Sequence, residues 1–363
     1  MDKKRFIYIL TGIMGLMILV IIIIAVISAI GGKKLSYNQI EERMEKAAQN
    51  YFKDNASFLP KEDGKSVTVD SSTLVNGGYL PQLSDMVKDK VDCSGKVVVS
   101  KNGASYLYSP ILNCGDKYKT NRLLDVVTQN NPIVTSGDGL YAVGNVRKFK
   151  GEYIDNFVKI DGYLWRILDI DSEGYMRLIY ADKTKEDTYV WDDRYNIEKQ
   201  ENVGINNYSI SRIKEAIESL EAGNAYISEE SKAKLAYRPI CIGKRSADNL
   251  EMNINQECES IITDQLFGLP YTVDYVSAST DSNCQKIKDE SCKNYNYLMN
   301  SSYSSWTLTG QIERSYRAFS VSRSGFSISN ANSEKSLRPT IYLNVNVLYA
   351  SGTGTQADPY IIK

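Results

Sequence analysis

The chain has 363 residues, of which 42% are hydrophobic and 24% charged, so it can fold into more than one domain and is neither a disordered tail nor a fibrous repeat. It contains no histidine, which excludes His-dependent catalytic triads, His-ligated zinc or haem and imidazole pH switches. With 43 basic and 44 acidic side chains, the chain lacks the basic surplus that nucleic-acid binding requires, so we expect no nucleic-acid partner.

The first predicted element is an apolar segment near the N-terminus. Residues 6–30 carry no charge, and a helix of this length spans the roughly 30 Å hydrocarbon core of a bilayer. A cleaved signal peptide is the alternative, but its apolar region is only about 7–15 residues long. Lys3, Lys4 and Arg5 precede the segment, which by the positive-inside rule keeps the N-terminus in the cytoplasm. We therefore expect residues 1–34 to be a cytoplasmic stub and a single-pass anchor in the cell membrane, with the bulk of the chain extracellular.

The cysteines support an oxidising exterior. All six follow the apolar segment: Cys93, Cys114, Cys241, Cys258, Cys284 and Cys292. An even, clustered set in an exported chain indicates disulfides. A predicted hairpin with an Asn102-Gly103 turn brings Cys93 and Cys114 together at its open end, so we predict that bond. Six cysteines allow 15 connectivities, and proximity in the sequence favours Cys241–Cys258 and Cys284–Cys292 without fixing them.

A small α+β domain is expected over residues 35–120. Ser36 and Gln39 have the spacing of a capping box, and apolar residues at helical spacing then predict an amphipathic helix to about Lys53. A short strand, a short helix or turn and the disulfide hairpin follow, at residues 66–69, 73–80 and 96–108. Residues 121–138 are rich in turn-forming residues and are our predicted linker.

Residues 139–363 make the second predicted domain. Two strands joined by an Asp161-Gly162 turn are followed by a third strand, a helix and closing strands, at residues 156–160, 163–168, 175–180, 210–220, 337–348 and 360–362. The order of helices and strands lacks the βαβ rhythm of a parallel sheet. We therefore expect the α+β fold class for this domain too.

Several motifs carry a resemblance to a known family. They are Phe157-Val158-Lys159, Leu164-Trp165-Arg166-Ile167, Arg177-Leu178-Ile179, Trp306-Thr307-Leu308-Thr309, Arg338-Pro339-Thr340-Ile341-Tyr342-Leu343 and Gly352-Thr353-Gly354-Thr355 with Asp358-Pro359-Tyr360. Over residues 139–363 the chain resembles the C-terminal domain of uncharacterised surface proteins of low-GC Gram-positive bacteria, which is similar to the formylglycine-generating-enzyme-like branch of the C-type lectin fold. Residues 1–120 are similar in layout to type IV pilin-like proteins. The resemblance implies a C-type-lectin-like head on a pilin-like stalk.

The chemistry of those relatives does not carry over. Formylglycine-generating enzymes use redox cysteines late in the domain, yet no cysteine follows Cys292, and their iron-dependent relatives need histidine ligands. Two Ser-x-x-Lys matches, at Ser211 and Ser231, lack the partner motifs of acyl-transfer enzymes. We therefore expect no catalysis and no certain cofactor.

Tyrosine is the main signal for binding. The chain has 26 tyrosines against 8 phenylalanines, and tyrosine suits surfaces that stack on sugars or grip proteins. The resemblance assigns the ligand face to the region of Tyr295, Tyr297, Tyr303, Arg314, Tyr316, Arg317 and Arg323, to which we add Trp191. The alternative is that these rings cover a disulfide-bonded core.

One loop is a candidate calcium site. Asp192, Asp193 and Asn196 offer the oxygen ligands that calcium prefers, and lectin-like folds often hold calcium in this way. The alternative is a solvated loop capped by Trp191.

These observations predict a membrane-anchored recognition or adhesion protein that binds a protein or glycan at the cell surface. The alternative is a pilin-like structural subunit, for which Ala25 and Ala29 have the small-residue spacing that permits helices to self-assemble. True prepilins have a Gly-Phe processing point and a glutamate early in the helix, and residues 6–30 contain no acid.

Overall fold

A computed structural model describes residues 34–88, 91–182, 188–299 and 303–363, so the predicted membrane anchor lies outside the described residues. Within those ranges, no helix has the length and apolar character needed to cross a bilayer. The chain divides into two compact units. The first contains the residues up to Leu59, Val67–Val98 and Tyr108–Thr120, and the second contains Pro60–Ser66, Val99–Leu107 and Asn121–Lys363.

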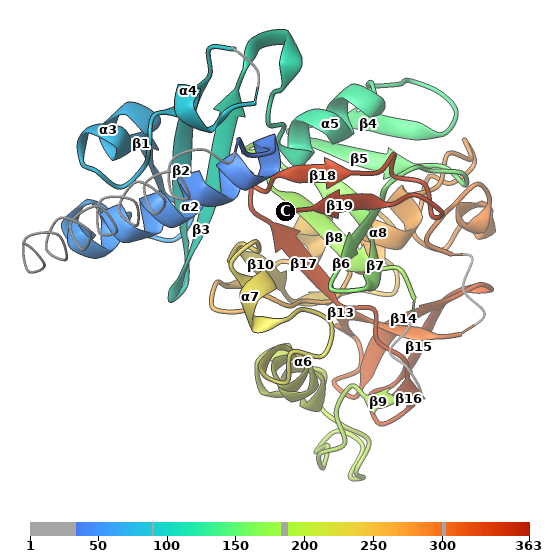
Figure 1. Cartoon of the computed structure of the whole chain (residues 1–363). Coiled ribbons are helices and arrows are strands. Elements are labelled where there is room, and N and C mark those ends of the chain that lie inside the picture. Colours follow the sequence, from blue (N-terminus) through green and yellow to red (C-terminus); the bar gives the residue numbers. More distant parts are fainter. Residues whose placement is uncertain (1–33, 89–90, 183–187, 300–302) are drawn as a thin grey trace, which may run out of the picture. The chain divides into compact units, whose positions relative to one another are not determined.

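The first unit combines helix α2 (Tyr37–Asp54) with most of a three-stranded sheet in the order β1-β2-β3 (Figure 1). The strands are β1 (Ser66–Asp70), β2 (Ser94–Asn102) and β3 (Ser105–Asn113), and short helices are α3 (Ser71–Asn76), α4 (Leu83–Met86), η1 (Ala56–Phe58) and η2 (Gly115–Lys117). The predicted capping box is confirmed, since Ser36 and Gln39 each accept from the other's backbone N–H. Met44 of α2 packs closely over Gly95, where a Cβ would lie 2.6 Å from the methionine methyl carbon, so a larger residue there would require the Met44 side chain to shift.

The disulfides are as the sequence indicated. Cys93 and Cys114 are bonded at the open end of the β2–β3 hairpin, which confirms that prediction. Cys241 is bonded to Cys258 and Cys284 to Cys292, as their proximity favoured. Each bond closes a short local loop and stabilises the fold mainly by restricting the unfolded chain.

The second unit contains an eight-stranded sheet. Its main order is β17-β8-β7-β6-β19-β18, with β5 paired to β7 and β4 to β5 (Figure 1). The strands are β4 (Gly139–Val143), β5 (Val146–Lys150), β6 (Phe157–Ile160), β7 (Tyr163–Ile170), β8 (Met176–Tyr180), β17 (Thr340–Leu343), β18 (Tyr349–Ser351) and β19 (Tyr360–Ile362). The β6–β7 turn has positive φ at both Asp161 and Gly162, the conformation that an Asp-Gly hairpin turn favours. Strand β19 runs parallel to β6 and antiparallel to β18.

A second sheet, in the order β11-β13-β14-β15, completes this unit with two small ladders, β10–β12 and β9–β16. Their bounds are β9 (Tyr189–Val190), β10 (Ile240–Ile242), β11 (Lys244–Arg245), β12 (Ser260–Ile262), β13 (Ser305–Gln311), β14 (Arg317–Ser322), β15 (Gly325–Asn330) and β16 (Glu334–Lys335). The helices are α5 (Leu123–Asn130), α6 (Arg212–Ala222), α7 (Glu229–Lys232), α8 (Thr272–Ser277), η3 (Tyr208–Ile210), η4 (Ile254–Glu257) and η5 (Glu290–Lys293).

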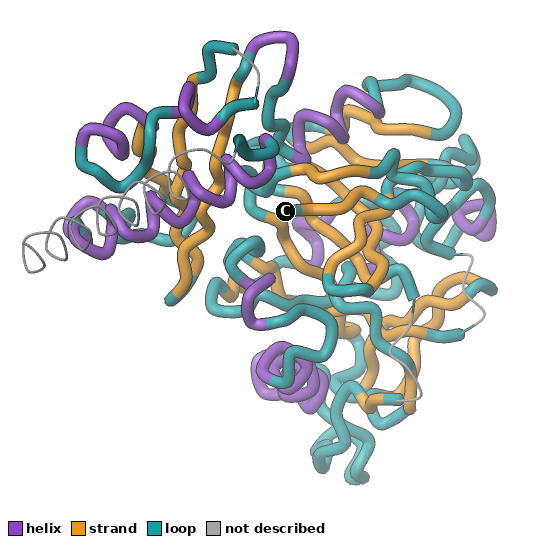
Figure 2. Tube along the Cα trace, viewed as in Figure 1, coloured by secondary structure: helices purple, strands orange, loops and turns teal. Residues whose placement is uncertain are grey.

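Strands and loops dominate this unit and helices are few, so the described chain has the expected α+β class (Figure 2). The stretch 121–138, our predicted linker, contains α5 and belongs to the second unit. The core is continuous and buries all three tryptophans, Trp165, Trp191 and Trp306.

A buried ion triad joins the large sheet to helix α8. Arg177 of β8 donates to Asp169 of β7, with 2.6 Å between Nη2 and Oδ2, and also to Asp274 of α8. Asp274 in turn accepts the backbone N–H of Tyr271 at 2.9 Å, which caps the first turn of the helix. Because α8 also contacts β13 and β14, the triad helps to fix one sheet against the other.

The triad generates a prediction about stability. We expect Asp274→Ala to lower the free energy of unfolding by about 3–5 kcal/mol, because it leaves the Arg177 charge buried with half of its partners. Urea unfolding of the full-length chain, followed by tryptophan fluorescence, measures the loss. Asp125→Ala is the matched control, since Asp125 pairs with Arg122 at the surface of the same unit and its loss should cost less than about 1 kcal/mol. Equal losses of unfolding free energy in the two variants would show that the triad contributes no more to stability than a surface ion pair.

Candidate ligand-binding cleft

A cleft of about 860 Å³ lies in the second unit, within the size range of small-ligand pockets. It is bounded by the segment before β6, by the β6–β7 hairpin, by the end of β8 and by residues that flank β13 and β17. Six aromatic rings line it: Tyr153, Phe157, Tyr163, Tyr180, Tyr297 and Tyr303. Five charged side chains also line it: Glu152, Asp155, Arg166, Asp182 and Arg338.

Arg166 is held between two of these rings. The antiparallel register of β6 and β7 places Phe157 directly opposite Arg166, so that both side chains lie on one face of the hairpin. The guanidinium carbon is 4.3 Å from the ring centroid of Phe157 and 4.3 Å from that of Tyr297. Its Nε donates to Asn156 Oδ1 at 2.8 Å, and Nη2 donates to the Ile154 carbonyl at 3.0 Å. Cation–π contacts and hydrogen bonds together hold the guanidinium in one orientation.

Arg338, just before β17, donates to backbone carbonyl oxygens. Its side chain is buried, and Nε and Nη1 donate at 3.1 Å to the carbonyls of Tyr180 and Leu298. A longer contact of 3.5 Å joins Nη2 to the Ala181 carbonyl. Arg338 thereby ties the end of β8 to the chain near Leu298.

Both guanidinium groups keep a net positive charge. In the part of the chain that the structure describes, neither Arg166 nor Arg338 forms an ion pair with a carboxylate. Burial lowers the pKa of Arg166 to about 10, and the positive charge of Arg338 acts in the same direction. Arg166 therefore remains protonated at neutral pH. The acidic residues Asp155 and Asp182 are exposed, so the cleft combines cations on its buried side with carboxylates nearer to solvent.

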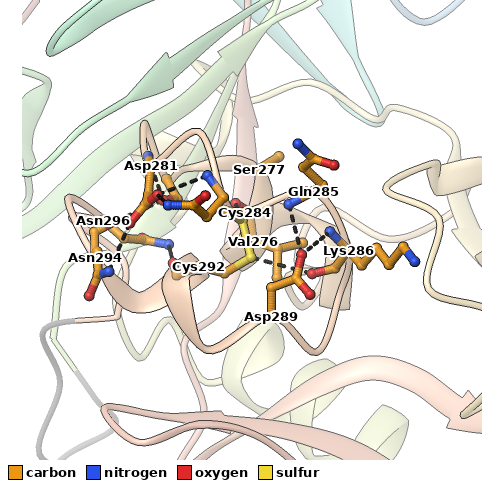
Figure 3. The surroundings of a disulfide bond; sticks show 12 residues. Val276, Ser277, Asp281, Cys284, Gln285, Lys286, Asp289, Cys292, Asn294 and Asn296 are labelled. Atoms are coloured by element: carbon orange, nitrogen blue, oxygen red, sulfur yellow. Dashed lines mark hydrogen bonds between the residues drawn. A yellow bond between two sulfur atoms is a disulfide. The ribbon is translucent and has the colours of Figure 1, made fainter.

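The loop closed by the Cys284–Cys292 disulfide (Figure 3) is followed in the chain by Asn296 and Tyr297. Asn296, next in the chain to Tyr297, donates its side-chain amide to the carbonyls of Tyr275 at 2.6 Å and Cys292 at 2.7 Å. The Tyr297 backbone N–H donates to the Gly151 carbonyl at 2.7 Å. The disulfide loop is therefore connected through Asn296 to the wall of the cleft.

Of the eight predicted ligand contacts, only Tyr297 and Tyr303 line this cleft. Tyr297 is buried, and the Tyr303 hydroxyl lies 3.3 Å from the Asp182 carboxylate. Tyr295 is exposed but does not line the cleft. Trp191 is fully buried and donates its indole N–H to the Thr307 carbonyl at 3.1 Å, so it packs in the core.

The predicted contacts after Trp306 are arranged around β14 instead. Arg314 pairs with Glu198 at 3.4 Å, and Arg317 bonds to Asn330 and lies over the ring of Tyr316, which is buried. Arg323 is exposed in the turn between β14 and β15. These four side chains do not line the cleft.

The candidate calcium residues have partners within the protein. Asp192 is fully buried, and its carboxylate accepts the backbone N–H groups of Arg194, Ile205 and Arg212 at 3.0, 2.9 and 3.2 Å. Those N–H groups take three of the roughly four acceptor positions of the carboxylate. The described residues include no cluster of three or more His, Cys, Asp or Glu side chains suited to a metal.

The other two candidate ligands also have partners of their own. Asp193 accepts from Arg212 Nε at 2.9 Å, and Asn196 donates to the Gly204 carbonyl at 2.8 Å. These side chains therefore organise the loop. The two Ser-x-x-Lys serines are structural as well, because Ser211 caps α6 and Ser231 donates to Asp161 at 2.9 Å.

Sequence reasoning missed the two cleft arginines. Both lie in the motifs named above: Arg166 interrupts the apolar strand pattern of Leu164-Trp165-Arg166-Ile167, and Arg338 stands just before the strand that begins at Thr340. That unexpected charge was the available signal in the sequence.

Comparison of the chain with protein-family models, curated proteins and solved structures finds no match.

The Asp192 loop gives a second stability prediction. We expect Asp192→Ala to lower the free energy of unfolding by about 2–4 kcal/mol, because three backbone N–H groups lose one buried acceptor. Asp193→Ala, which removes an exposed ion pair, should cost less than about 1 kcal/mol. Thermal melts of both variants test this, and the melting temperature should be the same in calcium and in chelator. A lower melting temperature of the wild-type protein in chelator than in calcium would support calcium binding by this loop.

Proposed function

We propose that this chain is a membrane-anchored extracytoplasmic recognition protein that binds a glycan or protein ligand without catalysis. Residues 6–30 would be the anchor, and the second unit would be a C-type-lectin-like head. The observation that carries the proposal is the aromatic cleft. Tyrosine rings stack on sugar faces and their hydroxyls exchange hydrogen bonds with polar ligands, so such a lining suits recognition.

The construction of the cleft also supports a binding role. Its wall is held by a disulfide loop, by the β6–β7 hairpin and by the carbonyl contacts of Arg338. A pocket held in shape before the ligand arrives loses less conformational entropy on binding. The two sheets, long loops and local disulfides are compatible with the lectin-like fold that the sequence resembles.

Truncating the accessible rings tests the proposal. We expect the full-length protein in detergent to bind members of a glycan array or a cell-wall fraction, and Tyr153→Ala and Tyr303→Ala to weaken binding by about tenfold each, since one stacked ring contributes roughly 1–2 kcal/mol. Tyr195→Ala is the control, because Tyr195 is exposed but does not line the cleft. Binding that none of these variants changes would place the ligand elsewhere.

A pilin-like structural subunit is the second candidate. Its supporting observation is the first unit, where the amphipathic helix α2 follows the predicted anchor and a three-stranded sheet comes next. If no glycan or cell-wall fraction binds, and the full-length protein forms filaments under the electron microscope, this second function replaces the first.

Sidedness has its own test. On intact cells, a membrane-impermeant thiol reagent should label the six cysteines only after reduction, and added protease should remove the bulk of the chain. Free thiols together with full protection from protease would contradict the extracellular location.

A further inference from the structure

We propose that the ligand of the cleft is an acidic saccharide, a sugar that carries one carboxylate, and that Arg166 and Arg338 bind this carboxylate. The inference rests on the proposed function, because it specifies the ligand of the same cleft. It follows from three features of the cleft: the unpaired cations, the donors that those cations have left, and the position of the acids.

The first feature is the contrast with other buried arginines of the same unit. Arg177 pairs with two acids, and Arg245 pairs with Glu257, with 2.7 Å between Nε and Oε1, where both side chains are fully buried. A buried charge is costly unless an opposite charge compensates it. Among the described residues Arg166 and Arg338 form no such ion pair; their hydrogen bonds go to neutral acceptors, and the Asp155 carboxylate acts on Arg166 only from beyond ion-pair distance. An anionic ligand would supply the missing counter-charge.

The second feature is the number of donors that remain. A guanidinium has five N–H donors, and each of these two arginines uses three in its bonds to protein oxygens. Arg338 also lies beside the Tyr275 hydroxyl. The Phe157 and Tyr297 rings both pack against the Arg166 guanidinium, whose remaining donors lie in its own plane, as in every guanidinium. In-plane donors suit a carboxylate, which is itself planar.

The third feature separates a saccharide from more highly charged ligands. Asp155 and Asp182 lie in the same cleft and are exposed, so they repel a second negative charge. The same carboxylates accept hydrogen bonds from hydroxyl groups. A sugar with one carboxylate and several hydroxyls satisfies both the cations and the acids, and its ring stacks on the tyrosines.

A matched pair of ligands tests the inference without altering the protein. The probes are methyl galacturonoside and methyl galactoside, which share one ring and differ by a single carboxylate, together with sialyllactose and lactose. We expect calorimetry at physiological salt to show about tenfold or tighter binding of an acidic member over its neutral partner, since charge-assisted hydrogen bonds are about twice as strong as neutral ones. A peptide with a free C-terminal carboxylate is measured in parallel.

The outcomes are distinct. Equal binding of acidic and neutral sugars leaves the proposed function standing and overturns this inference. Binding of the peptide but of no saccharide also overturns it, in favour of a protein ligand. Failure of the sugars, the peptide, the array and the cell-wall fraction refutes the proposed function and the inference with it.

Two variants assign the effect to the named residues. Arg166→Gln should remove most of the preference for the acidic probe, while Arg314→Gln, at an exposed arginine outside the cleft, should leave it unchanged. Because Arg166 also bonds to protein groups, its variant is checked by thermal melting. Asp155→Asn changes an exposed side chain and should tighten binding of the acidic probe by about two- to threefold, with no effect on the neutral one. No change in either variant would overturn the assignment.

Discussion

The pairing of Arg177 with Asp169 and Asp274 is the interaction on which the second unit depends most. It lies between two strands of the large sheet and the first turn of α8, and α8 touches the smaller sheet. Each of the three charged side chains would be costly to bury without the others, because the hydration that it loses would not be replaced by ion pairs. The two layers of the unit are therefore tied by charge as well as by apolar contact. Helix α8 is too short to hold its position by intrinsic propensity.

The same electrostatic rule distinguishes structural arginines from candidate ligand contacts. Arg245 repeats the structural pattern, since it pairs with Glu257 and donates to the carbonyls of Glu251 and Asn253, which shapes that loop. Glu257 then accepts from Thr309 at 2.6 Å and from the Thr272 backbone N–H at 3.2 Å. At the cleft the neutral acceptors orient the cations but leave their charge in place. The cleft therefore presents uncompensated positive charge, whereas the charges of Arg177 and Arg245 are paired with carboxylates.

The sequence predicted features that local rules control. The Ser36 capping box, the Asp161-Gly162 turn and the Cys93–Cys114 bond all depend on residues close together in the chain, and each was confirmed. Strand β19 was expected from its composition, but its parallel partner β6 lies about two hundred residues earlier, and no periodicity specifies such a pairing.

The candidate site was harder to predict for the same reason. Tyr297 and Tyr303 were found, but the antiparallel turn from β13 into β14 carries Arg314 and Arg317 to another region of the unit. Neighbours in sequence were therefore not neighbours in space. The structure adds that the Asp192 carboxylate accepts the N–H groups of its own loop, which a residue pattern does not reveal. Arg166 is a candidate ligand contact because no carboxylate of the described residues forms an ion pair with it. The sequence alone does not show which acids will lie beside an arginine in the fold.

The position of β19 in the sheet has a consequence for the order in which this unit folds during synthesis. This strand, Tyr360–Ile362, lies between β6 and β18, and the Tyr360 ring is fully buried. During synthesis β6 emerges early and must wait with one edge uncovered until Tyr360 has left the ribosome. The large sheet can therefore close only after the roughly two hundred residues from β6 to β19 have been synthesised. Closure of the sheet is thus a late event in the folding of this unit, and the open β-edge that precedes it is one that a chaperone can shield.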